Sequence, residues 1–234
     1  MNQRDLHTLI NSVLASGRSA LNAPEAKKIC DAYKILTPKQ ALAKSPAEAA
    51  KIASRMGFPI VLKIVSDDIL HKTEAGGVMV GVKNGREVRS AFDRLMTNAK
   101  AYKKNVAILG VQLQSMVKTG QEVMVGAVTD PSFGKIVGFG LGGVFVEVMK
   151  DITFRLAPIS KKDALAMLDA VAGAEILRGV RGAKGVNRVA LAEIICNVSR
   201  LVNDFPEILE VDLNPIFAND KGAMAVCAYS CRGS

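Results

Sequence analysis

The chain has 234 residues, of which 49% are hydrophobic and 23% are charged, so it can form one large or two small globular domains with substantial cores. No apolar run approaches the roughly 18 residues of a membrane span, and the first residues lack the pattern of a secretory signal, so we expect a cytoplasmic protein with no membrane partner. The net charge of +9 suits a phosphate-rich small molecule such as a nucleotide or coenzyme A, whereas scattered basic residues and an aromatic content of 5% argue against a nucleic-acid partner.

The first part of the chain is predicted to combine helices with a buried strand. One helix has proline in its first turn, at Pro24, and a second follows a capping sequence that begins at Ser45 and has Glu48 three residues later. A strand then covers residues 59–65 and contains Lys63. A lysine in such a strand must extend its ammonium group to the rim, pair with a carboxylate or point into a polar cleft.

The segment at residues 66–80, SDDILHKTEAGGVMV, contains His71, one of the two histidines of the chain. With a pKa near ~6.5, an imidazole can act as a nucleophile or a base at neutral pH. By spacing alone, a surface or helix-capping histidine is the slightly more common explanation. We expect Gly76 and Gly77 to let the backbone bend around a bulky anion. Three neighbouring carboxylates could orient one ring nitrogen: Asp67, Asp68 and Glu74.

The remainder of the chain is predicted to form strands and then helices. A short strand, VMVGV, is followed by a turn at Asn84-Gly85 and by a helix of about four turns from Arg86. Helices also follow from Lys161, and two strands end the pattern. Regular turn signals predict an antiparallel meander of three strands, over residues 106–117, 122–130 and 135–143. We therefore expect an α+β protein with two lobes and a cleft between them.

Two further motifs contain candidate ligands. The motif GFGLGG, residues 138–143, follows a strand, and its glycines let backbone N–H groups approach an anion; a tight turn or bulge explains the same pattern. The motif EVDLNPI alternates Glu210, Asp212 and Asn214, which places all three on one face of a strand. Hard oxygen ligands of this kind favour Mg²⁺. A solvated edge strand is the alternative.

These motifs occur in a fixed order, and together they resemble one family. The matching stretches are PIVLKI, SDDILHKTEAGGV, EVMVGAVTDPSFG, GFGLGGVFVEVMKDITFRLAPI, ILRGVRG and EVDLNPI. Their order and spacing resemble the ATP-grasp (β) subunit of nucleoside-diphosphate-forming acyl-CoA synthetases, as in ADP-forming acetyl-CoA synthetase. The resemblance extends from about Pro24 to Ala225, which is nearly the whole chain.

The resemblance implies a two-lobed ATP-grasp fold, with a smaller lobe at residues 24–110 and a larger lobe formed by residues 1–23 and 111–234. It implies an acid–thiol ligase that interconverts acyl-CoA, ADP and phosphate with a carboxylic acid, coenzyme A and ATP through a phosphohistidine relay. It also implies a partner α subunit, which binds coenzyme A, carries its own phosphorylated histidine and forms a heterotetramer with this chain. The sequence leaves open which acid reacts and whether ATP or GTP is used.

The same resemblance implies roles for individual residues. His71 matches the histidine that is thought to receive the phosphoryl group and pass it on, and Lys63 would hold the nucleotide phosphates. Mg²⁺ would lie on Asp212 and Asn214, with Glu210 as a further candidate ligand. The nucleotide side of the site would also include Glu122, backbone donors at Gly140, Gly142 and Gly143, and two arginines, Arg155 and Arg181.

One position departs from the pattern of the family. The last strand of the family usually carries an aspartate that is the second magnesium ligand, and this chain has Cys227 there. A neutral thiol is a poor ligand for Mg²⁺, so Asp212 or Glu210 would have to compensate. The alternative function is therefore a catalytically weakened nucleotide-binding module with a regulatory or scaffolding role. The presence of His71 favours catalysis.

Overall fold

The computed structural model describes residues 2–69, 71–117, 120–143, 151–180, 182 and 184–226. Two of the candidate residues, Arg181 and Cys227, lie outside these ranges. The chain divides into two compact units. The larger unit consists of Met1–Thr37 and Lys118–Ser234, and the smaller unit of Pro38–Val117.

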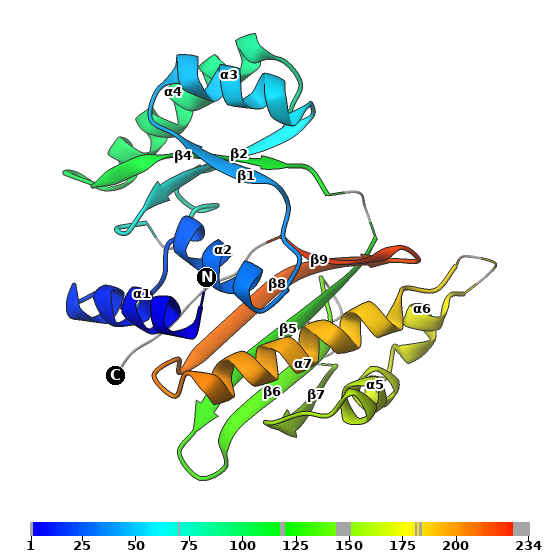
Figure 1. Ribbon diagram of the computed structural model, residues 1–234. Helices are drawn as coiled ribbons and strands as arrows, with labels where there is room; N and C mark the ends of the chain where they lie inside the picture. Colours follow the sequence, from blue (N-terminus) through cyan, green and yellow to red (C-terminus); the bar gives the residue numbers. More distant parts are fainter. Residues whose placement is uncertain are drawn as a thin grey trace. The chain divides into compact units, whose positions relative to one another are not determined.

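The larger unit is an antiparallel sheet with helices on one face (Figure 1). The strands follow the order β7-β6-β5-β8-β9. Their bounds are β5 Gln121–Asp130, β6 Gly134–Leu141, β7 Ile152–Leu156, β8 Glu210–Asn219 and β9 Gly222–Ala225. The helices are α1 Gln3–Ala15, α2 Ala23–Ala32, α5 Lys161–Ala170, α6 Ala174–Arg178 and α7 Arg188–Asp204.

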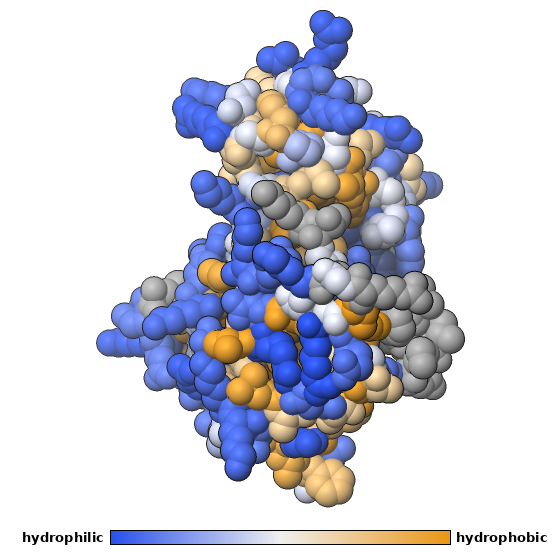
Figure 2. Space-filling model, turned by 90° about the vertical axis from the view of Figure 1, so that its right-hand side faces the viewer, coloured by the Kyte–Doolittle hydropathy of each residue, from blue (hydrophilic) through white to orange (hydrophobic). Residues whose placement is uncertain are grey.

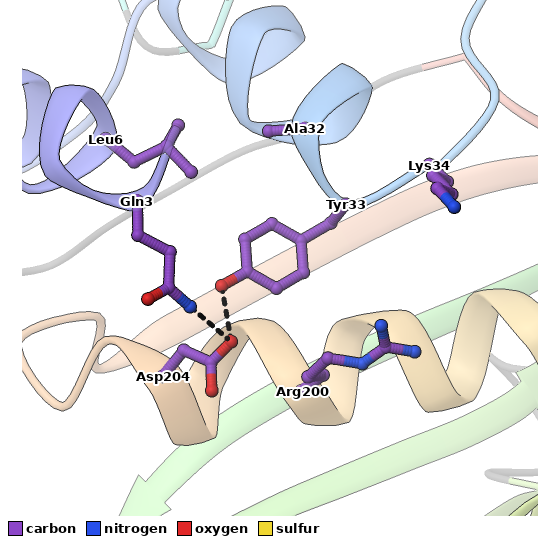
Figure 3. A pocket seen from close by; sticks show the side chains of 7 residues that line it. All are labelled: Gln3, Leu6, Ala32, Tyr33, Lys34, Arg200 and Asp204. Atoms are coloured by element: carbon purple, nitrogen blue, oxygen red, sulfur yellow. Dashed lines mark hydrogen bonds between the residues drawn. The ribbon is translucent and has the colours of Figure 1, made fainter. Parts of the chain in front are cut away.

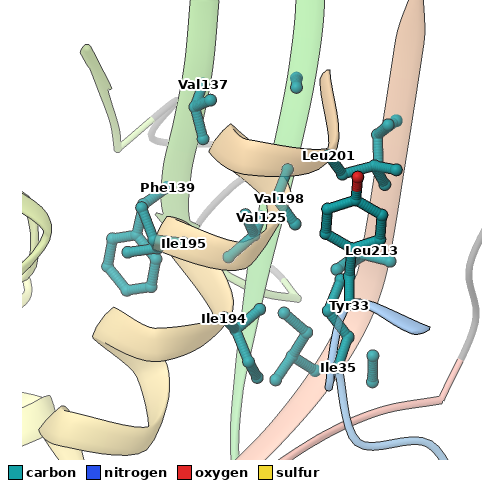
Figure 4. Close-up of a cluster of buried hydrophobic side chains, with 14 of the residues drawn as sticks. Tyr33, Ile35, Val125, Val137, Phe139, Ile194, Ile195, Val198, Leu201 and Leu213 are labelled. Atoms are coloured by element: carbon teal, nitrogen blue, oxygen red, sulfur yellow. The ribbon is translucent and has the colours of Figure 1, made fainter. Parts of the chain in front are cut away.

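The core of the larger unit lies between α7 and the sheet (Figure 4). Three apolar side chains of α7 lie there, Ile194, Ile195 and Val198. They pack in one cluster with strand residues, among them Val125 of β5 and Val137 and Phe139 of β6. Tyr33 and Ile35, which follow α2, are buried in the same cluster. Because burying one large apolar side chain is worth about 1.5–3 kcal/mol, these contacts hold residues 24–37 in the larger unit. The boundary therefore lies at Thr37, and the expected start of the smaller lobe at residue 24 is wrong.

The smaller unit is a second antiparallel sheet, with two helices on one face (Figure 1). Its strand order is β1-β4-β2-β3. The strands are β1 Gln40–Ala43, β2 Ile60–Ser66, β3 Val78–Val82 and β4 Ile108–Ser115, and the helices are α3 Pro46–Met56 and α4 Gly85–Tyr102. Alternate residues of β2 and β4 face the helices and form the core, namely Ile60, Leu62, Ile64, Val111 and Leu113.

The predicted meander of three strands is only partly correct. Strands β5 and β6 form the expected antiparallel hairpin, but β4 belongs to the sheet of the smaller unit and pairs with β1 and β2. The physical reason is that the apolar side chains of β4 and β5 are buried in different cores. Val111 and Leu113 of β4 pack in the core of the smaller unit, whereas Val123 and Val125 of β5 pack in that of the larger unit. The smaller unit therefore extends to Val117 and does not end at residue 110.

Helix caps explain several element boundaries in the smaller unit. The Ser45 side chain accepts a hydrogen bond from the backbone N–H of Glu48 at 3.2 Å, but the Glu48 carboxylate accepts from the backbone N–H of Lys44, so the capping box is incomplete. Asn84 does not form a hairpin turn. Its side chain accepts from the backbone N–H groups of Arg86 and Glu87, which makes it the N-cap of the 18-residue helix α4.

The surface carries mostly polar side chains on the face shown in Figure 2, where apolar side chains form smaller groups between hydrophilic ones. In the part of the chain that the structure describes, no helix is both long and apolar enough to cross a membrane. The exposed large apolar residues of the larger unit include Phe133, Phe154 and Leu156.

Candidate functional site

The carboxylates of β8 lie on the sheet face opposite the helices of the larger unit. Val211 and Leu213 pack into the core, so the alternation of the strand directs Glu210 and Asp212 to the other face, as their spacing predicts. Asp212 is paired with Gly126 of β5 across the ladder. The glycine leaves no side chain beside Asp212 on this neighbouring strand. Gly126 was not predicted from the sequence, although a glycine inside an apolar strand is a signal of close approach.

The electrostatics around Glu210 and Asp212 favour a bound cation. Burial raises the pKa of the Asp212 carboxyl above its ordinary value, and the negative charge of Glu210 raises it further. Both causes disfavour the ionised form, and a divalent cation would relieve both. Among the described residues, no group of three or more His, Cys, Asp and Glu side chains is placed to hold a metal. A cation here would therefore need ligands besides Glu210 and Asp212. Asn214, the third predicted ligand, is exposed and lies at a register shift, where two residues of β8 oppose one residue of β5.

The glycine-rich segment is half strand and half loop. Gly140 lies inside β6, paired with Met124 on one side and Ile152 on the other, so the prediction of a loop from residue 138 is wrong. Only Gly142 and Gly143 follow the strand. The Gly142 N–H donates to the Glu122 carbonyl at 2.7 Å, and a Cβ at Gly142 would lie 2.9 Å from the Glu122 backbone. The segment is thus packed tightly onto β5 next to Glu122, and the Gly142 donor is already used.

Arg155 lies on the other face of the sheet. It is paired with Val137 across the β6–β7 ladder, and residues paired in this way share a face. Val137 is buried in the core under the helices. Arg155 is exposed on that side at an edge strand, where its guanidinium donates to the Phe154 carbonyl at 2.8 Å. The structure therefore does not bring Arg155 together with Asp212.

Lys63 occupies the middle of β2 in the smaller unit. Its neighbours Leu62 and Ile64 face the helices, so Lys63 lies on the opposite face of the sheet. Its ladder partners are Val78 of β3 and Gln112 of β4. The residue is only 8% exposed. It is a buried lysine in a central strand and not a lysine at a strand end.

His71 lies on the loop between β2 and β3. Its side chain is 75% exposed, and Nδ1 lies 3.9 Å from a carboxylate oxygen of Glu74, which is 70% exposed. From His71 to Gly77 the loop backbone is held by hydrogen bonds from the Ala75 N–H to the His71 carbonyl and from the Gly77 N–H to the Lys72 carbonyl. An accessible imidazole on an ordered backbone can meet a large reaction partner. This is the arrangement that a phosphoryl acceptor requires.

Asp68 does not orient the imidazole. Its carboxylate accepts a hydrogen bond from the Lys103 ammonium at 2.5 Å and another from the Ala107 backbone N–H at 2.7 Å. The hydrogen bond from Lys103, followed by that from Ala107, lowers the pKa of Asp68 below its ordinary value. Asp68 therefore ties the start of the loop to the segment after α4, and the expected contact with His71 is not formed.

Gly76 and Gly77 let the loop pack closely against the rest of the smaller unit. Gly76 has φ +58°, which favours glycine, and its carbonyl accepts a hydrogen bond from the Asn98 side chain at 2.9 Å. A Cβ at Gly77 would lie 2.6 Å from the Ile64 side chain and 2.9 Å from the Lys72 carbonyl oxygen. The pair thus allows close packing on β2 and α4. The expected bend around an anion is not needed to explain it.

Replacing Gly77 by alanine should destabilise the smaller unit. The overlap with Ile64 and Lys72 must be relieved by shifting the loop or the strand, at a cost of about 1–3 kcal/mol. Urea unfolding followed by circular dichroism should show a lower midpoint. Gly85→Ala is the matched control, because its added Cβ meets only Ala50 at 3.9 Å at the start of α4, where alanine is the better helix former. Equal midpoints for the two variants would contradict this packing.

Asp169, which was also not predicted from the sequence, joins both ends of a glycine-rich segment. Its carboxylate accepts from Arg178 at 2.5 Å and from Arg188 at 2.7 Å, and the hydrogen bonds from Arg188 and Arg178 lower its pKa. A backbone hydrogen bond from the Val186 N–H to the Leu177 carbonyl, at 2.9 Å, joins the same two ends of the segment. The available signal was the pair of arginines that flanks the glycines in LRGVRGAKGVNR.

Comparisons with known proteins agree with the fold described above. The family of the ATP-grasp domain matches residues 12–229. The β subunit of ADP-forming acetate–CoA ligase I from Pyrococcus furiosus is 48% identical over 205 residues, which are 88% of this chain and 88% of that subunit. The β subunit of ADP-forming acetate–CoA ligase II from the same organism is 41% identical over 219 residues, 93% of each chain.

Solved structures show the same similarity. A structure of Ca. Korarchaeum cryptofilum dinucleotide-forming acetyl-coenzyme A synthetase 1, in complex with coenzyme A, Ca-AMPCP and HgCl+, has 38% identity and a TM-score of 0.93 over 99% of this chain and 100% of that chain. Another structure of that enzyme, with coenzyme A and Mg-AMPPCP, has its phosphohistidine segment pointing towards the nucleotide binding site; its identity is 35% and its TM-score 0.85 over 97% of this chain and 99% of that chain. The chain therefore belongs to the ATP-grasp family, in the group formed by the β subunits of ADP-forming acyl-CoA synthetases.

Proposed function

We propose that the chain is the β subunit of an ADP-forming acyl-CoA synthetase and acts with a coenzyme A-binding α subunit. The reaction interconverts acyl-CoA, ADP and phosphate with a carboxylic acid, coenzyme A and ATP. The observation that carries this proposal is the exposed His71 on an anchored loop, in a chain nearly half identical to a β subunit of this activity over most of its length.

His71 is the proposed phosphoryl carrier on this chain. In the direction of ATP formation, a neutral ring nitrogen of His71 attacks the phosphorus of a phosphohistidine on the partner. The N–P bond of the partner breaks as the new N–P bond forms. A terminal oxygen of ADP then attacks the same phosphorus, the N–P bond on His71 breaks, and ATP leaves. The wide exposure of the imidazole is what access by a segment of another protein demands.

Each unit, taken by itself, has residues with a proposed role in nucleotide binding. In the smaller unit Lys63 neutralises phosphate charge. In the larger unit Asp212, Asn214 and Glu210 would hold Mg²⁺, whose chemistry when bound is neutralisation of phosphate charge. Glu122 and the loop at Gly143 contact the nucleotide beside them. Arg155 is not included, because it lies on the face of the sheet opposite Asp212.

The isolated chain should bind ATP with Mg²⁺ but form no acyl-CoA. Turnover should begin only when the α subunit is added, because acyl and coenzyme A binding and the first phosphohistidine belong to the partner. Calorimetry measures the binding, and a thiol assay for free coenzyme A measures the turnover. The matched control is the α subunit alone, which should also be inactive.

The outcomes separate this proposal from its alternative. Robust acyl-CoA synthesis by the isolated chain would contradict the role as a subunit. Nucleotide binding with no turnover under any combination of subunits would favour a weakened regulatory or scaffolding module. A heterotetramer with coenzyme A bound to the α subunit is the assembly expected on a sizing column with light scattering.

A further inference from the structure

A small cavity opens in the larger unit between the start of α1, the end of α2 and the last turns of α7 (Figure 3). Its volume is about 200 Å³. Leu6 and the Tyr33 ring supply apolar surface, while Lys34, Arg200 and Asp204 supply charge. The cavity therefore combines an apolar wall with ionic groups, which is the usual composition of a site for a small organic ligand.

The carboxylate in the cavity, Asp204, accepts its hydrogen bonds from neutral donors and keeps its negative charge. The Asp204 carboxylate accepts a hydrogen bond from the Tyr33 hydroxyl at 2.7 Å and one from the Gln3 side-chain amide at 3.4 Å (Figure 3). Burial raises the pKa of Tyr33, and Asp204 raises it further, so the phenol remains a neutral donor. Asp204 is thus not paired with the arginine that lines the same cavity.

The two cations of the cavity have no carboxylate partner among the described residues. Arg200 donates to the amide oxygen of Asn197 at 3.1 Å, and this partner is neutral. Neither Arg200 nor Lys34 forms a salt bridge within the described ranges. With the one carboxylate of Asp204, the two cations give the cavity a net positive charge, which attracts an anion.

Lys34 also has an unfavourable backbone conformation. Its φ is +55°, in the turn where the Ile35 N–H donates to the Cys30 carbonyl at 2.8 Å and ends α2. Glycine is the usual residue in this conformation, which is unfavourable for a residue that has a side chain. A lysine at a position suited to glycine points to a use for its ammonium group.

We propose that this cavity binds a short-chain carboxylate, with its carboxyl group on Lys34 and Arg200 and its alkyl chain against Leu6 and Tyr33. Inorganic phosphate would use the cations but gain nothing from the apolar wall. The binding of a carboxylate is inferred from the cavity alone. That this carboxylate is the same acid as in the acyl-CoA reaction rests on the proposed function. It is a second site, because Arg200 lies on α7, which covers one face of the sheet, and Asp212 lies on the opposite face.

An NMR titration of the whole chain with sodium butyrate tests this site. Amide signals of Lys34 and Asp204 should shift saturably, and sodium phosphate or chloride at equal ionic strength should bind at least about tenfold more weakly. Lys34→Gly and Arg200→Gln should each raise the Kd for butyrate by about tenfold or more, as expected for losing a charged hydrogen bond. Lys34→Gly also relieves the strained φ, so misfolding would not explain the loss.

Controls keep this test separate from the nucleotide site. Arg89→Gln removes one positive charge from the exposed surface of α4 and should leave butyrate binding unchanged. Asp212→Asn should bind butyrate like the unchanged chain even where nucleotide binding is lost, so failure of one proposal does not imply failure of the other. Unchanged affinity in both Lys34→Gly and Arg200→Gln, or tighter binding of phosphate than of butyrate, would overturn the proposal.

Discussion

His71→Ala is expected to lower ATP formation from acyl-CoA by the assembled enzyme at least about a thousandfold, within the range seen when the nucleophile of a covalent relay is removed. The imidazole is the proposed acceptor of the phosphoryl group, and an alanine cannot form the N–P bond. Because the side chain is 75% exposed, the variant should fold normally. The measurements are turnover of the complex and transfer of labelled phosphate from a phosphorylated α subunit to this chain.

The two histidines of the chain provide an internal control. The Nδ1–H of His7 donates a hydrogen bond to a carboxylate oxygen of Glu207 at 3.0 Å, and the His7 ring contacts the Phe205 ring. His7→Ala should therefore leave the labelled phosphate in place. Glu74→Gln should change turnover less than about threefold, since a pair this exposed is worth little. The label on the unchanged chain should be labile in acid. Equal labelling of His71→Ala and the unchanged chain would remove His71 from the relay.

The local elements of the fold could be predicted from the sequence because their causes are local. Ser45 caps α3, Gly57 ends it, and the apolar run after Pro59 forms β2. The alternation of Glu210 with Asp212 predicted a shared face, since a strand has a fixed period of two. Each of these features depends on residues only a few positions apart.

The parts that could not be predicted depend on long-range pairing. Strand β4 ends a few residues before β5, yet its hydrogen bonds go to β1 and β2, and no local pattern encodes that choice. Arg155 matched a family motif, but its face is set by its pairing with Val137. The exposed Gly76 and the buried Gly77 suggested room for a ligand, whereas their close neighbours are Asn98 and Ile64.

For the carboxylates of β8, Glu210 and Asp212, the structure adds the neighbours that the motif does not contain. The spacing predicted Glu210 and Asp212 on one face, but only the ladder shows that Asp212 faces Gly126. Burial and a neighbouring negative charge make the ionised Asp212 unfavourable in the metal-free protein. A group held in a costly charge state is a candidate for function and not for stability.

Asp212→Asn should therefore have opposite effects on stability and on binding. The folded-state pKa of Asp212 is raised, so above it the ionised carboxylate destabilises the fold relative to the unfolded chain. A neutral asparagine removes that penalty, and the melting temperature in EDTA at neutral pH should rise. Affinity for Mg²⁺ and ATP should fall at least about a hundredfold, since even outer-shell changes at metal sites cost about 10–100-fold. Asp220→Asn, in the turn after β8, should change neither.

The pH dependence of Mg²⁺ binding provides the sharper test, because it separates Asp212 from Glu210. Protons compete with the cation for Asp212, so affinity should be constant above the raised pKa and fall about tenfold per pH unit below it. Glu210→Gln removes the repulsive charge and lowers the pKa of Asp212, so the fall should begin at a lower pH. Calorimetric titrations with Mg²⁺ and ATP at several pH values would show this shift. If Glu210 is also a ligand, Glu210→Gln should in addition lower the affinity by a similar factor at every pH. A fall that does not begin at a lower pH in Glu210→Gln would contradict the repulsion, and an unchanged profile in both Glu210→Gln and Asp212→Asn would place the cation elsewhere.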